Sequence, residues 1–316
     1  MRILIVGAGA VGGYFGGRLL EAGGDVTFLV RPRRAEQLNR TGLSIRSPMG
    51  NADVSAPAVT RKELQSLFDL VLLSCKAYDL PDAMDSFAPA VGAKTAILPL
   101  LNGLRHIELL EERFGPSAVL GGQCLISATL DGDGRVLHLN DSHALSFGER
   151  DGSASERVLA IASAFTGTKF EACLSKAILL EMWEKWVFIA AAAGIACLMR
   201  APIGDIVTAG AADLAAALLD ECAAIASQQK FPPREAALQQ SRAMLTAAGS
   251  GLTPSMLRDI ERGARTEADH VLGDLLRRGG EPEGSHSLLR IAFAHLNVYE
   301  ARRARTDAAS DGASRT

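Results

Sequence analysis

Several features that would mark a specialised class of protein are scarce in this chain of 316 residues. Its five cysteines are scattered and contain no C-x-x-C pair, so we expect neither a disulfide framework nor a zinc site, in keeping with a reducing compartment. The six histidines show no metal-ligand spacing, and we predict no bound metal. A net charge of −3 gives no general attraction to nucleic acids or anionic membranes, so neither is expected as a partner.

Long hydrophobic runs are also lacking. The longest, Trp186 to Met199, has 14 residues, whereas a membrane-spanning helix needs about 20, and it predicts a buried helix instead. The apolar start of the chain has no basic leader before it, so no signal peptide is predicted. We therefore expect a soluble, cytoplasmic protein.

The first 31 residues have the pattern of a nucleotide-binding βαβ unit. An apolar run from Arg2 to Val6 predicts a buried parallel strand, followed by a helix from Val11 to Glu21 and a second strand from Asp25 to Val30. A G-x-G-x-x-G motif joins the first strand to the helix and consists of Gly7, Ala8, Gly9, Ala10, Val11 and Gly12. Its glycines allow a tight turn, close approach of a pyrophosphate and close packing of the helix, whose N-terminus attracts phosphate. The alternative is a glycine turn without chemistry, but the strand before it and the helix after it favour dinucleotide binding.

The residue after the second strand indicates which dinucleotide binds. NAD-binding folds usually place an acidic residue there, whereas this chain has Arg31, followed by Arg33 and Arg34. A guanidinium matches the 2′-phosphate of NADP, which a carboxylate would repel. The motif therefore predicts NADP (NADPH) as the cofactor, the alternative being a solvated basic loop.

Two polar residues follow further strands predicted in the first half. Lys76 comes after the apolar run from Asp69 to Ser74, and Asn102 comes after the strand from Thr95 to Pro99. Ligands of open α/β sheets bind at the carboxyl ends of strands, so both residues are candidates for the site. From position alone a surface lysine is an equally good interpretation of Lys76, and an ordinary Asn-Gly turn is the better interpretation of Asn102. Short strands at 43–46 and 52–56 precede them, and strands at 118–130, 136–139 and 144–147 are expected to extend the sheet by antiparallel pairing.

The second half is helical in pattern. Helices are predicted at 179–199, 211–229, 234–247, 263–278 and 287–304. The sequence thus predicts an α/β dinucleotide-binding domain at 1–172, an all-helical domain at 173–303, and a flexible tail at 304–316.

Taken together, these motifs resemble the ketopantoate reductase family (2-dehydropantoate 2-reductase). The resemblance covers nearly the whole chain and rests on the glycine motif, Arg31, Cys75-Lys76-Ala77, Asn102-Gly103, Trp183-Glu184-Lys185, and the segment from Pro254 to Ile260 leading to Arg265-Thr266-Glu267. It implies a Rossmann domain and a helical domain with the site in a cleft between them, a homodimer, and NADPH-dependent reduction of a 2-oxo acid to a 2-hydroxy acid.

The resemblance also implies a role for each site residue. Lys185 would be the general acid that protonates the carbonyl oxygen, and Glu267 would orient the substrate or the lysine. Ser255 would bind the substrate carboxylate, whereas Lys76 and Asn102 would hold the cofactor ribose and the substrate. Without the other matches, Lys185 would be interpreted as a lysine extending from a core helix into solvent.

Three positions depart from the family pattern. The family carries asparagines that bind the distal hydroxyl of ketopantoate where this chain has Ile189 and Ala193, and a further asparagine where it has Leu252. Losing groups that bind a substrate hydroxyl lowers selectivity for it, so Ile189 and Ala193 are predicted to line a site for a less polar 2-oxo acid. Ketopantoate itself and a non-catalytic NADPH-binding sensor are the alternatives.

Overall fold

The computed structural model describes residues 1–280 and 287–313 and divides into two compact units, Met1–Leu179 and Leu180–Thr316. The sequence placed this boundary at 172/173. The difference arises because strand β10 (Glu171–Leu174) pairs in parallel with β9 (Val136–Gly148) and so belongs to the first unit. The predicted order, an α/β unit followed by a helical unit, is confirmed.

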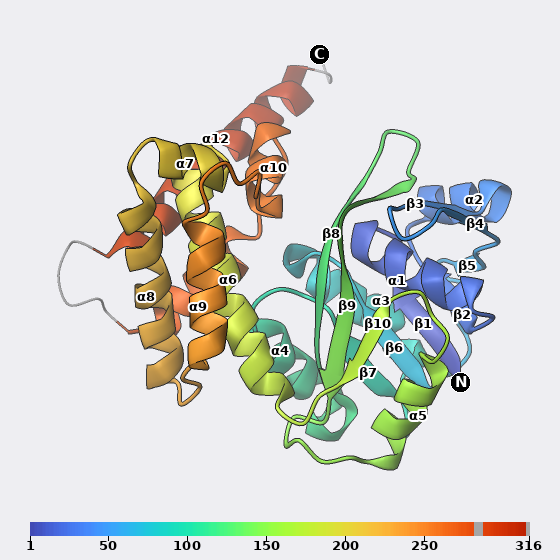
Figure 1. The fold of residues 1–316 in the computed structure, drawn as a ribbon. Coiled ribbons are helices and arrows are strands. Elements are labelled where there is room, and N and C mark those ends of the chain that lie inside the picture. Colours follow the sequence, from blue (N-terminus) through green and yellow to red (C-terminus); the bar gives the residue numbers. More distant parts are fainter. Residues whose placement is uncertain (281–286, 314–316) are drawn as a thin grey trace. The chain divides into compact units, whose positions relative to one another are not determined.

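The first unit is built on a five-stranded sheet in the order β5-β2-β1-β6-β7 (Figure 1). All its neighbouring strands pair in parallel. The strands are β1 (Arg2–Val6), β2 (Asp25–Leu29), β5 (Ala58–Val59), β6 (Leu70–Leu73) and β7 (Ala96–Pro99). Because Val6 lies beside Leu73, the glycine motif after β1 and the polar residues after β6 emerge at the same edge.

A second sheet corrects the prediction that the later strands extend the first one. Strand β9 is continuous where two strands were expected, and it pairs antiparallel with β8 (Gly121–Leu130). On its other edge β9 pairs in parallel with β3 (Leu43–Arg46), which pairs antiparallel with β4 (Ala52–Val54). The antiparallel pairing was predicted correctly, but the sheet to which it belongs was not.

Helix α1 (Ala10–Glu21) packs against both sheets through glycines on two of its faces. A Cβ atom at Gly16 would lie 2.7 Å from the Phe28 ring of the parallel sheet, and one at Gly17 would lie 2.7 Å from Ile45 of the second sheet. Interiors are packed too closely to absorb such overlaps without displacement. The glycines therefore allow this helix to be sandwiched between two sheets.

The remaining helices of the first unit lie between the strands in the sequence. They are α2 (Pro32–Thr41), the short 3₁₀ helices η1 (Ala77–Asp79), η2 (Ala88–Ala90) and η3 (Pro116–Ala118), and α3 (Leu80–Phe87), α4 (Arg105–Phe114) and α5 (Glu156–Ala164).

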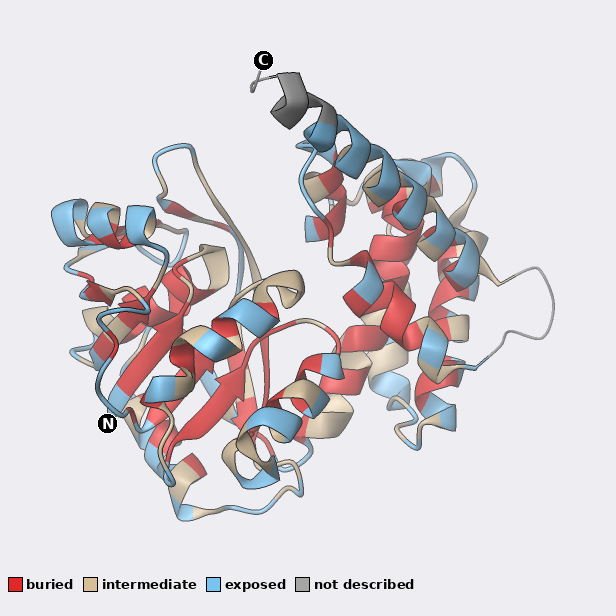
Figure 2. Cartoon of the chain, turned by 180° about the vertical axis from the view of Figure 1, so that it is seen from behind, coloured by how far each residue is buried: buried red, intermediate tan, exposed pale blue. Residues whose placement is uncertain are grey.

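The second unit is helical, and its core helix is α6 (Ile178–Met199). The helices after it are α7 (Ile203–Thr208), α8 (Ala212–Gln228), α9 (Glu235–Leu245), α10 (Ser255–Glu261), the π-helical turn η4 (Asp269–Gly273), α11 (Asp274–Arg278) and α12 (Leu288–Ala313). By length and composition α6 could cross a membrane, but 67% of its most apolar window is buried within the protein (Figure 2).

Two stretches of the second unit differ from the sequence prediction. The helix expected from residue 263 begins only after Glu267, because Ala264 and Thr266 are hydrogen-bonded to α12 instead. The predicted flexible tail is helical to Ala313, and an ion pair between Arg303 and Asp307 supports that helix at i,i+4 spacing. Residues 314–316 lie outside the described part of the chain.

Candidate active site

The glycine motif has the shape that a dinucleotide phosphate requires. Gly7 has φ +94°, a conformation that favours glycine, and its N–H donates to the Leu29 carbonyl over 3.0 Å. A Cβ atom at Gly12 would overlap the Gly7 carbonyl oxygen and Ser74 Oγ, so the helix can pack here only with glycine. At Gly9, by contrast, no atom lies within 4 Å of the position of a Cβ, and α1 begins at the next residue. Open space before a helix N-terminus fits a pyrophosphate.

The three arginines after β2 have different surroundings. The Arg31 side chain is 74% exposed, and its guanidinium donates to the Asp79 carboxylate over 2.9 Å. An exposed ion pair of this kind contributes only about 0–1 kcal/mol, so Arg31 can turn to another anion. Arg33 is exposed as well. Arg34 instead donates to the Gly134 carbonyl, in the turn between β8 and β9, and burial lowers the pKa of its guanidinium. Because this hydrogen bond holds the turn, Arg34 has a structural role.

Lys76 and Asn102 follow neighbouring strands of the parallel sheet. Strands β6 and β7 are paired, with Leu73 beside Pro99, and Lys76 and Asn102 come three residues after these two positions. Both residues are partly buried, and the Asn102 amide makes no hydrogen bond to any residue that the structure describes. An amide without a partner can donate to and accept from a ligand.

Lys185 lies on α6, between Trp183 and Trp186 in the sequence. It is partly buried, and within residues 1–280 and 287–313 it has no hydrogen bond or ion pair. The neighbouring Trp186 is fully buried, and its indole Nε1–H donates to the Val271 carbonyl over 2.8 Å. Trp183 stacks on the Phe231 ring, with centroids 5.6 Å apart. The two tryptophans thus anchor α6 to other parts of its unit, one before and one after the lysine in the sequence.

Glu184, also beside Lys185, has a structural partner. Its carboxylate accepts from the Arg234 guanidinium and from the Arg234 backbone N–H, at distances between 2.5 and 2.9 Å. The hydrogen bond to this carboxylate raises the pKa of Arg234. The start of α9 therefore compensates the charge of Glu184, whereas Lys185 has no such partner among the described residues.

The segment before Glu267 is held by helix α12. The Glu300 carboxylate accepts from both the backbone N–H and the hydroxyl of Thr266, each over 2.7 Å, and the Tyr299 hydroxyl donates to the Ala264 carbonyl over 2.7 Å. Glu267 is partly buried, and its carbonyl accepts from the Val271 N–H over 2.9 Å. Because Val271 is also the partner of Trp186, the hydrogen bonds link the turn after Glu267 to the helix that carries Lys185.

This support was missed in the sequence. In the sequence Trp186 was only the first residue of an apolar run, and Thr266 and Glu300 were not assigned a role in placing Glu267. The π-helical turn that follows, with the Asp274 N–H bonded to the Asp269 carbonyl, also gives no local sequence signal, although such turns are frequent at functional sites.

The remaining candidates occupy the same unit. Ser255 is exposed at the first residue of α10, and Leu252, three residues earlier, accepts from the Ile203 N–H of α7 over 3.1 Å. Ile189 is partly buried and Ala193 is buried, one and two turns beyond Lys185 on α6. The dinucleotide candidates thus lie in the first unit. The second unit contains the substrate and catalytic candidates Lys185, Ile189, Ala193, Ser255 and Glu267. A cleft between the units stays a prediction.

Comparison with known proteins decides the family. The N-terminal model described as "Ketopantoate reductase PanE/ApbA" matches residues 3–152, and its C-terminal counterpart matches residues 177–300. The chain belongs to the ketopantoate reductase family. An uncharacterised oxidoreductase of Bacillus subtilis, YkpB, is 40% identical to it over 96% of this chain and the full length of that protein.

Solved structures agree with the assignment to the ketopantoate reductase family. The 2-dehydropantoate 2-reductase of Methylococcus capsulatus has a TM-score of 0.84 and 26% identity, and the match covers 96% of this chain and 98% of that one. D-Mandelate dehydrogenase with NADH and anilino(oxo)acetate has the same TM-score at 22% identity, over 96% of this chain and 99% of that one, which shows a shared fold. The family relatives include oxidoreductases, and nicotinamide dinucleotides bind to this fold.

Proposed function

We propose that this protein is an NADPH-dependent reductase that converts a 2-oxo acid into the 2-hydroxy acid. One observation carries the proposal: the partly buried Lys185 has no partner among the described residues, and the Trp186–Val271 hydrogen bond ties its helix to the turn after Glu267. An ammonium that is neither paired nor fully solvated is suited to donate a proton to a substrate oxygen.

In the proposed reaction, NADPH when bound supplies the hydride that the carbonyl carbon accepts. Lys185 Nζ donates a proton to the carbonyl oxygen, so that one hydride and one proton convert the 2-oxo acid to the 2-hydroxy acid. Ser255 and Lys76 bind the substrate carboxylate, because a hydroxyl and an ammonium are both donors. Glu267 orients the lysine or the substrate, and Asn102 holds the cofactor ribose and the substrate.

Ketopantoate is the substrate that family membership favours, which would place the reaction in pantothenate biosynthesis. A second candidate is a less polar 2-oxo acid, and it is favoured by Ile189, Ala193 and Leu252, which present no polar side chain for a distal hydroxyl. The fold itself does not restrict the substrate to ketopantoate, since D-mandelate dehydrogenase shares it. A non-catalytic sensor is disfavoured because it needs no proton donor at Lys185.

Steady-state NADPH oxidation with ketopantoate and a panel of aliphatic and aromatic 2-oxo acids tests the proposal. We expect unsubstituted oxo acids to have the higher kcat/KM, and the double substitution Ile189→Asn and Ala193→Asn to shift the ratio towards ketopantoate by about tenfold or more. Ala177→Asn, at an exposed position directly before α6, is the control. Efficient turnover of ketopantoate by the unmodified protein would reject the less polar substrate, and NADPH binding without any turnover would reject the reductase.

The preference for NADPH over NADH is expected to depend on Arg31. Removing its guanidinium in Arg31→Gln deletes charge-assisted hydrogen bonds to a 2′-phosphate, each contributing about 1.5–3 kcal/mol, so NADPH binding should weaken by about tenfold or more while NADH binding is unchanged. Fluorescence titration with both cofactors measures this. Arg34→Gln is not a suitable comparison because Arg34 holds the loop at Gly134. Equal losses for NADPH and NADH would contradict the assignment.

We further propose a homodimer that acts in the cytoplasm. A dimeric ketopantoate reductase from Staphylococcus aureus has the same fold, with a TM-score of 0.81. The buried position of α6 agrees with a protein that does not use this helix as a membrane anchor.

A further inference from the structure

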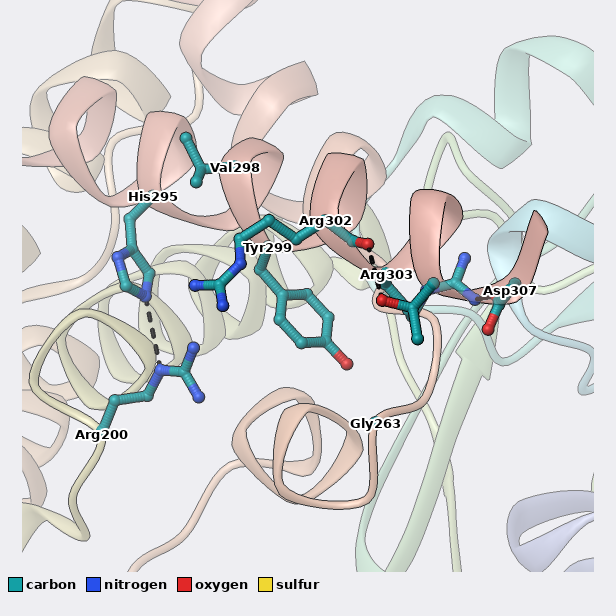
Figure 3. Close-up of a pocket in the computed structure, with 9 residues that line it drawn as sticks. Arg200, Gly263, His295, Val298, Tyr299, Arg302, Arg303 and Asp307 are labelled. Atoms are coloured by element: carbon teal, nitrogen blue, oxygen red, sulfur yellow. Dashed lines mark hydrogen bonds and ion pairs between the residues drawn. The ribbon is translucent and has the colours of Figure 1, made fainter. Parts of the chain in front are cut away.

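A pocket of 410 Å³ lies in the second unit, and none of the residues assigned above to the dinucleotide or the 2-oxo acid lines it (Figure 3). One side is formed by His295, Tyr299 and Arg302 of α12, and the other by Arg200, directly after α6, and by Gly263. Arg200 has φ +55°, the left-handed conformation that a non-glycine residue rarely adopts. Local strain of this kind is often found at ligand sites.

The pocket has an excess of positive charge. Its third arginine, Arg303, is already compensated by Glu300 and Asp307, at 3.2 and 2.5 Å. Arg200 donates one N–H to His295 Nε2 over 3.4 Å, and in the part of the chain that the structure describes neither Arg200 nor Arg302 has a carboxylate partner. Two guanidinium groups are therefore available at the pocket, each with several N–H donors.

The Asp307 carboxylate at the pocket is paired with Arg303, and the His295 ring and the Tyr299 hydroxyl are uncharged. Burial, followed by the charge of Arg200, lowers the pKa of His295, so its ring stays uncharged and accepts from that arginine. Burial raises the pKa of Tyr299, as do the charges of Glu300 and Asp259, so its hydroxyl stays protonated and donates to the Ala264 carbonyl. The cationic character of the pocket thus comes from Arg200 and Arg302.

We propose that this pocket binds a small organic anion through a phosphate or carboxylate group, with Arg200 and Arg302 as the counter-charges. Guanidinium groups match the planar and multiple acceptors of both oxyanions. The volume of the pocket falls within the range of small-molecule sites and exceeds what a bare inorganic ion needs. Val298 and the Tyr299 ring supply apolar surface for the rest of the ligand. The occupant would contact the turn of α12 whose residues are hydrogen-bonded to Ala264 and Thr266, in the segment that precedes Glu267.

Isothermal titration of the full-length protein at constant ionic strength tests the proposal, with glucose 6-phosphate and citrate as probes for the two oxyanions. We expect at least one probe to bind, and Arg200→Gln and Arg302→Gln each to weaken its binding by about tenfold or more. Binding of only one probe identifies the anionic group that the pocket prefers.

Two control variants separate this pocket from other cationic sites. Arg290→Gln removes an exposed charge from the same helix outside the pocket, and Arg31→Gln removes the cation proposed for the dinucleotide site. Both should bind the probes as the unmodified protein does. The proposal is overturned if neither probe binds. It is also overturned if the Arg200→Gln, Arg302→Gln double variant has a normal circular dichroism spectrum and binds the probes as the unmodified protein does.

Discussion

Lys185→Ala is expected to lower kcat by about 10²–10⁴-fold, the usual contribution of a positioned general acid, while NADPH binding stays unchanged. The reason is that the substitution removes the proposed proton donor without removing a contact that supports the fold. In the structure the lysine has no partner among the described residues, whereas Trp186 beside it is fully buried. Single-turnover measurement of NADPH oxidation, together with a cofactor titration, separates chemistry from binding.

Two further variants make the experiment specific for proton donation. Lys185→Arg keeps the positive charge but replaces the ammonium with a guanidinium, which does not release its proton, so it should remain nearly as inactive as the alanine variant. Lys176→Ala removes an exposed lysine near the start of α6 and should be fully active. Activity of Lys185→Arg close to that of the unmodified protein would instead show that only the charge is needed.

Gly12→Ala should both destabilise the first unit and abolish cofactor binding. Its Cβ would overlap the Gly7 carbonyl oxygen, a backbone atom that can move only if the turn changes shape. Overpacking of this kind costs about 1–3 kcal/mol, which corresponds to a melting temperature lower by roughly 2–12 °C in a unit of this size. Differential scanning calorimetry gives the stability, and NADPH fluorescence gives the binding.

Gly9→Ala should separate these two effects. No atom lies within 4 Å of the position of its Cβ, so the variant should melt as the unmodified protein does. It should nevertheless bind NADPH at least about tenfold more weakly, because the methyl group occupies space proposed for the pyrophosphate. Gly132→Ala, in an exposed turn with equal room, should change neither property. Unchanged NADPH binding by Gly9→Ala would mean that the pyrophosphate does not lie there.

Local patterns were enough to predict several parts of this protein. Continuous apolar runs predicted β1 and β6, and the positions of β2 and β7 were also predicted correctly. The glycine motif predicted the turn before α1, because a tight turn constrains residue type within a few positions. Family motifs identified Lys185, Ser255 and Glu267 as site candidates without indicating what holds them.

Features that depend on residues far apart in the chain became visible only in the folded structure. The second sheet forms because β9 pairs with β3, about ninety residues earlier, and the glycines of α1 let it pack there. The Trp186–Val271 hydrogen bond spans 85 residues and the Thr266–Glu300 hydrogen bond spans 34. No periodicity encodes such pairs, since each donor could be satisfied by many acceptors until packing of the core selects one.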